Sequence, residues 1–173
     1  MLQAPVSTVA VVVLVVAAIA WDLTARRVPN WLTAGAAVSA FGIHAVTGGW
    51  PDVALAAAGW AVGLMLFFPL FALKGMGAGD LKLLAAFGAW LGPLGAIWTG
   101  LYGAVVGGVM ALMLIVGRSC MGQTAQNIGA MFRTWRLHGL RPVESVTLES
   151  SVGPRLPYAL PIAAGALVTL WFR

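Results

Sequence analysis

Long runs without a charged residue constrain this chain more than any other feature of its sequence. The runs extend from Val6 to Trp21, from about Trp31 to Val46, from Val53 to Leu73, from Leu83 to Gly117 and from Leu156 to Phe172. A helix needs about 20 apolar residues to cross roughly 30 Å of hydrocarbon. Because 61% of the residues are hydrophobic, 9% are charged and the mean hydropathy is +0.94, the composition excludes a water-soluble globular protein. We therefore expect an all-α integral membrane protein.

The breaks between these runs predict a polytopic bundle of about six transmembrane helices in a single domain, residues 1–173. The uncharged run after Leu83 is too long for one crossing, so Gly92-Pro93-Leu94-Gly95 is expected to reverse the chain inside it. Prolines, glycines and other turn residues indicate the remaining connections. These connections are expected at residues 22–30, 47–52, 74–79 and 118–155.

The basic residues indicate the orientation of the bundle. Cytoplasmic flanks of membrane helices collect Lys and Arg, and an outside N-terminus followed by six crossings leaves only Arg173 on the opposite side. Membrane topology therefore explains the net charge of +5, and we expect no nucleic-acid partner. The first apolar run is followed by an acid and two arginines, and no small-residue cleavage site is evident, so it is expected to be a retained helix.

Two aspartates stand at the ends of apolar runs, and the predicted topology places both at the cytoplasmic face. Asp22 follows the first run, and Asp80 follows the glycine-rich Gly77-Ala78-Gly79. A carboxylate close to hydrocarbon is costly, so both positions are candidates for function. Each also has a purely structural explanation. Asp80 could serve as the N-cap of the next helix, and Asp22 could pair with Arg26 or Arg27.

Taken together, the two residues predict an aspartyl pair. Two carboxyl groups within reach of one water cannot both ionise easily, so they share a proton. The ionised member draws a proton from water as the water attacks a peptide carbonyl, and the protonated member donates to the developing oxyanion. Such hydrolysis needs no metal and no other cofactor. Glycine before Asp80 lets the backbone approach an extended substrate closely.

The polar segment 118–155 is expected to be a cytoplasmic loop that contains an amphipathic helix. Its apolar residues follow i, i+3, i+4, i+7 spacing at Ile128, Met131, Phe132 and Trp135. Arg133 and Arg136 lie off this stripe. We interpret the helix as an anchor in the lipid headgroup layer, with contact to a substrate as the alternative.

Pairs of glycines four residues apart predict close contacts between helices. The pairs include Gly59 with Gly63, Gly88 with Gly92 and Gly103 with Gly107. Because the chain contains 22 glycines, these pairs support a tight bundle and identify neither a function nor a dimer face.

The stretches around the two aspartates resemble the type IV prepilin peptidases, which are GxGD membrane aspartyl proteases. The matching stretches are Asp22-Leu-Thr-Ala-Arg26-Arg27-Val28-Pro29-Asn30, Gly77-Ala-Gly79-Asp80-Leu-Lys82 and Pro157-Tyr158-Ala-Leu-Pro-Ile-Ala-Ala-Gly165. The resemblance covers nearly the whole chain. The chain is short, and in this respect it is most similar to the branch of the family that serves tight-adherence (Flp-type) pili.

This resemblance implies removal of a short, basic leader from a Flp-type prepilin at the cytoplasmic face of the bacterial inner membrane. It implies that Asp22 and Asp80 are catalytic and that Gly77 and Gly79 shape the loop before Asp80. Further residues of the matching stretches are candidates for supporting the site or the substrate, namely Lys82, Arg26, Pro29 and Asn30. Lys82 is explained equally well as a positive-inside anchor.

The same resemblance also predicts what this chain does not do. The long prepilin peptidases carry a four-cysteine zinc site in a large cytoplasmic region and methylate the new N-terminus. This chain has the single cysteine Cys120 and a short connection after its first apolar run. We therefore expect peptidase activity without N-methyltransferase activity.

Two other classes of protein remain as alternatives. A small proton- or cation-coupled transporter would use the same two aspartates, although a transporter is expected to place acids near the membrane midplane and to show a repeat between its halves. A structural subunit of a pilus platform would need neither carboxylate.

Overall fold

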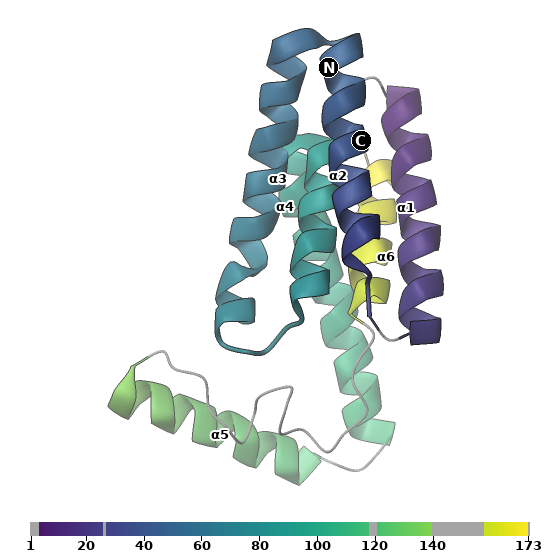
Figure 1. The fold of residues 1–173 in the computed structure, drawn as a ribbon. Helices are drawn as coiled ribbons and strands as arrows, with labels where there is room; N and C mark the ends of the chain where they lie inside the picture. Colours follow the sequence, from purple (N-terminus) through teal and green to yellow (C-terminus); the bar gives the residue numbers. More distant parts are fainter. Residues whose placement is uncertain (1–3, 26, 118–120, 140–157, 173) are drawn as a thin grey trace.

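The computed structural model describes residues 4–25, 27–117, 121–139 and 158–172. These residues form six α-helices and no strand, and all of the helices except α5 pack into a bundle (Figure 1). The helices are α1 (Ala4–Ala25), α2 (Asn30–Thr47), α3 (Gly49–Ala72), α4 (Ala78–Gly117), α5 (Met121–His138) and α6 (Ala159–Trp171). Helices α1, α3 and α4 are long and apolar enough to cross a membrane. The predicted all-α membrane bundle is confirmed.

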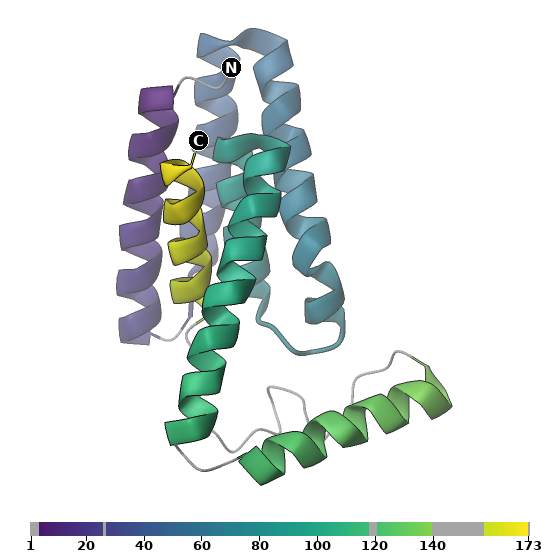
Figure 2. The same ribbon diagram turned by 180° about the vertical axis from the view of Figure 1, so that it is seen from behind.

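Helix α4 folds back on itself at Gly92. The backbone of Gly92 has φ 74° and ψ 179°, which glycine adopts readily, and Pro93 follows it. The two sides of the turn then meet, because a Cβ added at Gly88 would lie 3.1 Å from the Cβ of Ala96. The predicted reversal of the chain is confirmed. Figure 2 shows the two antiparallel limbs, residues 78–91 and 93–117.

The first limb of α4 is too short to cross a bilayer and is enclosed by the other helices. Residues 78–91 rise about 21 Å at 1.5 Å per residue, against roughly 30 Å of hydrocarbon. The turn accordingly lies below the upper ends of α2 and α3 in Figure 1. Every residue from Leu83 to Gly92 is buried. This limb therefore forms the core on which the other helices pack.

Glycines bring α3 and α4 into backbone contact. A Cβ added at Gly59 would collide with the carbonyl oxygen of Gly88, and one at Gly63 would lie 2.7 Å from the Cα of Ala85. A real Cβ essentially never lies within 3.0 Å of a heavy atom to which it is not bonded. The predicted close packing is therefore confirmed. The second limb of α4 meets α6 in a similar way, because a Cβ added at Gly165 would collide with the main chain of Thr99 and Gly103, whereas Gly107 makes only ordinary contact with the side chain of Pro161.

The end of α1 differs from the sequence-based prediction. The helix continues to Ala25, so Asp22 lies in its last turn and not in the connection that follows. The hydroxyl of Thr24 donates a hydrogen bond to the carbonyl oxygen of Ala20 at 2.8 Å, which keeps this polar side chain within the helix. Asp22 is therefore held by a rigid element.

The start of α3 also differs from the prediction, because the helix begins at Gly49. Asp52 thus belongs to its first turn and not to a connection at residues 47–52. Gly49 has φ 66°, a value that favours glycine, and lets the chain reverse after the single residue Gly48.

Several expectations concern residues outside the described ranges. These residues are Arg26, Arg118, Cys120, Arg141, Arg155, Pro157 and Arg173.

The glycine contact between α3 and α4 predicts a specific loss of stability. Gly59→Ala should destabilise the fold by about 1 to 3 kcal/mol, because the added methyl group overpacks the contact with Gly88. Gly108→Ala is the matched control in α4, since a Cβ there has nothing within 4 Å. It should leave stability unchanged or raise it by up to about 1 kcal/mol. Unfolding in detergent micelles measures both variants, and equal stability would contradict the proposed contact.

Candidate active site

Asp22 faces the inside of the bundle from the last turn of α1. Its side chain is 6% exposed. The backbone N–H of Ala159, the first residue of α6, donates a hydrogen bond to its carboxyl group. The Oδ2 atom is buried and has no hydrogen-bond partner within the described part of the chain. Because a buried polar atom without a partner is costly, this oxygen can accept a proton or a hydrogen bond from water or substrate.

Asp80 lies in the first turn of α4 and is not the N-cap that its structural explanation required. The helix begins after Gly77, whose carbonyl oxygen accepts the N–H of Leu81 at 3.4 Å. The N–H of Gly77 donates to the carboxyl group of Asp80, as in a capping box. The side chain of Asp80 therefore accepts a hydrogen bond from the residue three positions before it. Glycine leaves room for this, since a Cβ added at Gly77 would lie 3.2 Å from Asp80 Oδ2.

The bundle brings the two aspartates to the same end. Helix α1 ends, and α4 and α6 begin, at the lower end in Figure 1, next to α5. The carboxyl groups of Asp22 and Asp80 are close enough for their charges to interact. The alternative partner Arg27 is exposed and forms no ion pair with Asp22 in the described structure. Two acids far apart in the sequence thus lie at one end of the bundle, within range of each other's charge.

The connection between α1 and α2 packs against the first turn of α4. A Cβ added at Gly79 would lie 3.2 Å from the carbonyl oxygen of Val28. Pro29 precedes α2 with φ −70° and ψ 142°. The Nζ atom of Lys82 donates a hydrogen bond to Oδ1 of Asn30 at 2.9 Å. The structure therefore places the candidate supporting residues Pro29, Asn30 and Lys82 beside the turn that carries Asp80.

Tyr158 and Ala159 belong to the same end, although sequence reasoning gave them no role. Ala159 holds Asp22 through its backbone amide, which no side-chain pattern reveals. Burial and the negative charge of Asp80 raise the pKa of the Tyr158 phenol above its usual value near 10. Tyr158 therefore stays protonated at neutral pH and remains a hydrogen-bond donor near Asp80.

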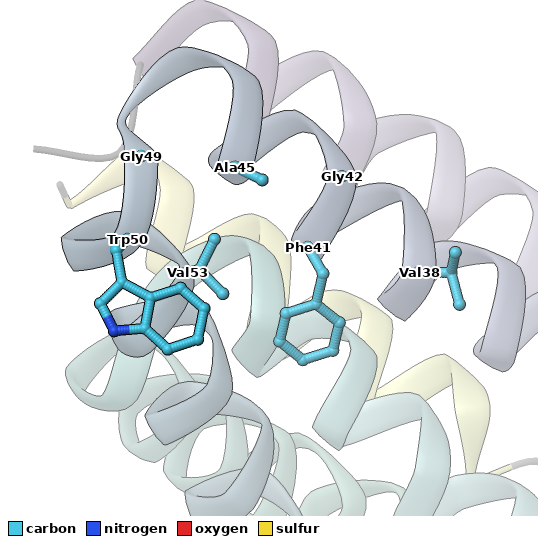
Figure 3. Close-up of a pocket in the computed structure, with 7 residues that line it drawn as sticks. All are labelled: Val38, Phe41, Gly42, Ala45, Gly49, Trp50 and Val53. Atoms are coloured by element: carbon cyan, nitrogen blue, oxygen red, sulfur yellow. The ribbon is translucent and has the colours of Figure 1, made fainter.

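The groove at the opposite end of the bundle offers no comparable chemistry. A groove of about 560 Å³ between α2 and α3 has no acid, base or nucleophile in its lining (Figure 3). The lining residues are Val38, Phe41, Gly42, Ala45, Gly49, Trp50 and Val53. Within the described residues, no group of three or more His, Cys, Asp or Glu could hold a metal ion.

The sequence model of the type IV leader peptidase family matches residues 9–112, more than half of the chain. The chain belongs to this family. The match contains Asp22, Asp80 and all of the connection between α1 and α2, and it ends before α5 and α6. No curated protein and no solved structure gives a significant match. This type IV leader peptidase therefore carries its two interacting aspartates inside the matched region, while Tyr158 and Ala159 lie beyond it.

The position of Tyr158 next to Asp80 in this leader peptidase can be tested by titration. Asp80→Asn removes a negative charge that disfavours the phenolate, so the pKa of Tyr158 should fall towards its usual value. The remaining burial should keep it above that value. Asp52→Asn, at the opposite end of the bundle, should leave it unchanged.

The phenolate absorbance of the purified protein gives the measurement, and Tyr158→Phe separates its signal from that of Tyr102, the other tyrosine. A Tyr158 titration that Asp80→Asn does not move would show that the two side chains are not neighbours.

Proposed function

We propose that this leader peptidase is an aspartic endopeptidase that removes the leader of Flp-type prepilins, with Asp22 and Asp80 as its catalytic pair. The observation that carries the proposal is that the helix ends bearing the two aspartates lie at one end of an apolar bundle (Figure 1), with their carboxyl groups close enough for their charges to interact. The unpartnered, buried Oδ2 of Asp22 supports it, because such an atom is suited to hold a proton or a water. Family membership supports the leader peptidase class.

The proposed reaction uses one ionised and one protonated carboxyl group. The carboxylate removes a proton from water as the water oxygen bonds to the scissile carbonyl carbon. The other carboxyl group donates its proton to the carbonyl oxygen, which gives a tetrahedral diol. The diol then collapses as the C–N bond breaks, the amine nitrogen takes a proton from one aspartate, and a diol hydroxyl returns a proton to the other. One water is consumed and both aspartates regain their initial states.

Backbone donors prepare the two side chains for these steps. The N–H groups of Ala159 and Gly77 hold the carboxyl groups of Asp22 and Asp80 respectively. Both donors belong to helix N-termini, where the peptide dipoles favour negative charge. These donors offset part of the cost of burying an ionised carboxyl group at the site.

We place the site at the cytoplasmic face of the bacterial inner membrane, with the N-terminus outside. The connections and helices that carry the basic residues of the described ranges lie at the aspartate end (Figure 1), in agreement with the positive-inside rule. These residues are Arg27, Lys74, Lys82, Arg133 and Arg136. The acid Asp52 lies at the opposite end, at the start of α3.

The catalytic pair can be tested in lipid vesicles that contain the protein and a Flp-type prepilin. Asp22→Asn and Asp80→Asn should each lower leader cleavage by roughly 100- to 10,000-fold, the range expected when a general acid or base is lost. Asp52→Asn is the matched control and should cleave normally. Supplied S-adenosylmethionine should leave the product unmethylated.

Each outcome of this experiment has a defined meaning. Cleavage by either folded active-site variant removes that aspartate from catalysis. If the wild-type protein cleaves no prepilin but conducts ions, the two aspartates serve the alternative transport function.

We also propose that α5 lies in the headgroup layer beside this end of the bundle. The helix runs across the end of the bundle in Figures 1 and 2. Its apolar side chains Ile128 and Phe132 are 48% and 63% exposed. Arg133 and Arg136 are exposed, and α5 contains no acidic residue. An apolar stripe next to positive charge matches the surface of an anionic bilayer.

Hydrogen exchange tests the placement of α5. A short helix is marginally stable in water, and each arginine near an anionic surface contributes about 1 kcal/mol. In vesicles of anionic lipid, Arg133→Glu combined with Arg136→Glu should therefore raise amide exchange in α5 at least tenfold. Exchange in α3 serves as the internal control. High salt should reproduce part of the effect through screening, and exchange that depends on neither charge nor lipid would argue against the headgroup location.

A further inference from the structure

The first turn of α4 presents two different faces to the rest of the bundle. Asp80 points to the site shared with Asp22. Gly79 and Lys82 are three residues apart and therefore lie on one face of the helix. This second face receives the connection between α1 and α2.

Two contacts define how the connection sits on this face. The main chain of Val28 approaches Gly79 so closely that an added Cβ would lie 3.2 Å from its carbonyl oxygen and 3.7 Å from its nitrogen. Two residues later, Oδ1 of Asn30 accepts the hydrogen bond from Lys82 Nζ at 2.9 Å. Glycine thus permits the approach, and the Asn30–Lys82 hydrogen bond fastens it.

The same connection is also tied to the end of α1 that carries Asp22. Trp21 and Trp31 meet edge to face, with ring centroids 5.3 Å apart and an interplanar angle of 86°. Trp21 precedes Asp22, and Trp31 follows Asn30. A continuous series of contacts therefore leads from the aspartate of α1, through the start of α2, to the turn that carries the aspartate of α4.

We infer that the hydrogen bond between Asn30 and Lys82 is a latch that sets the separation of Asp22 and Asp80. Asn30 and Lys82 are then positioning residues for the reaction, and this inference rests on the proposed function. The latch differs from a positive-inside anchor, which needs the charge of Lys82 and no particular acceptor. Asn30 distinguishes the two, because it carries no charge and contributes only the acceptor and donor groups of its amide.

Kinetics of prepilin cleavage test the latch. Lys82→Met keeps the length of the stem and removes the donor, and Asn30→Leu removes the acceptor at similar volume. Each should lower kcat at least tenfold while KM changes less than about twofold, since groups that only position the aspartates do not bind substrate. The double variant should be no slower than either single variant. Asn30→Asp should retain activity, because its carboxylate can accept from Lys82.

Lys74→Met is the matched control, because it removes the same charge from the loop before α4 and keeps both partners of the Asn30–Lys82 hydrogen bond. A pure anchoring role would make Lys74→Met as harmful as Lys82→Met, and it would leave Asn30→Leu at the wild-type rate. Either result overturns the latch. Independent, additive losses from Lys82→Met and Asn30→Leu would overturn it as well.

A distance measurement tests the latch without relying on activity. Spin labels at Ala25→Cys and Ala78→Cys, both exposed positions, report the separation of the ends of α1 and α4 once Cys120→Ser has removed the single native cysteine. Lys82→Met and Asn30→Leu should broaden the distance distribution, and Lys74→Met should not. An unchanged distribution in both latch variants overturns the inference even if the wild-type protein cleaves prepilin. Broadening in both latch variants, together with a wild-type protein that cleaves no prepilin, would support the latch and contradict the proposed function.

Discussion

The enclosed first limb of α4 is the element on which the rest of the structure depends. Lipid offers no hydrogen bonds to a backbone, so a chain that reverses within the apolar depth must surround the turn with protein. Contact with Gly59 and Gly63 of α3 gives the limb its cover on one side, and α1, α2 and α6 contact α4 as well. Its N-terminal turn can then present Asp80 to the interior of the bundle and not to lipid.

The two glycines before Asp80 have separate physical reasons. Gly77 is the N-cap, and its backbone N–H donates a hydrogen bond to the carboxyl group of Asp80. A side chain at this position would press on Oδ2 of Asp80. Gly79 lets the main chain of Val28 lie on the opposite face of the same turn. The two glycines, which in the sequence suggest one flexible loop, therefore make two separate contacts in the fold, one with Asp80 and one with Val28. Rigidity of this kind favours catalysis, because reacting groups must be held in one geometry.

Much of the fold follows from the sequence, because apolar length and turn residues act locally. The bundle, the reversal at Gly92 and the membership of the leader peptidase family were all predicted correctly, whereas the catalytic pairing of the aspartates stays a prediction. The extension of α1 through Asp22 and the return of Asp80 to Gly77 were not foreseen, since helix ends depend on hydrogen bonds that composition does not record. The role of Ala159 was not predicted, because it contributes a backbone N–H to Asp22 from a helix that is distant in the sequence.

The short limb of α4 and α6 has a consequence for the lipid around the protein. Residues 78–91 and α6 are each about 20 Å long, while α1 and α3 are long enough to span the bilayer. The bilayer therefore meets a bundle of uneven hydrophobic height, and mismatch costs a fraction of a kcal/mol per Å. The shorter helices are those that carry Asp80 and Ala159. Membrane thickness acts directly on the spanning helices α1 and α3, and the enclosed limb that carries Asp80 meets it through its contact with α3.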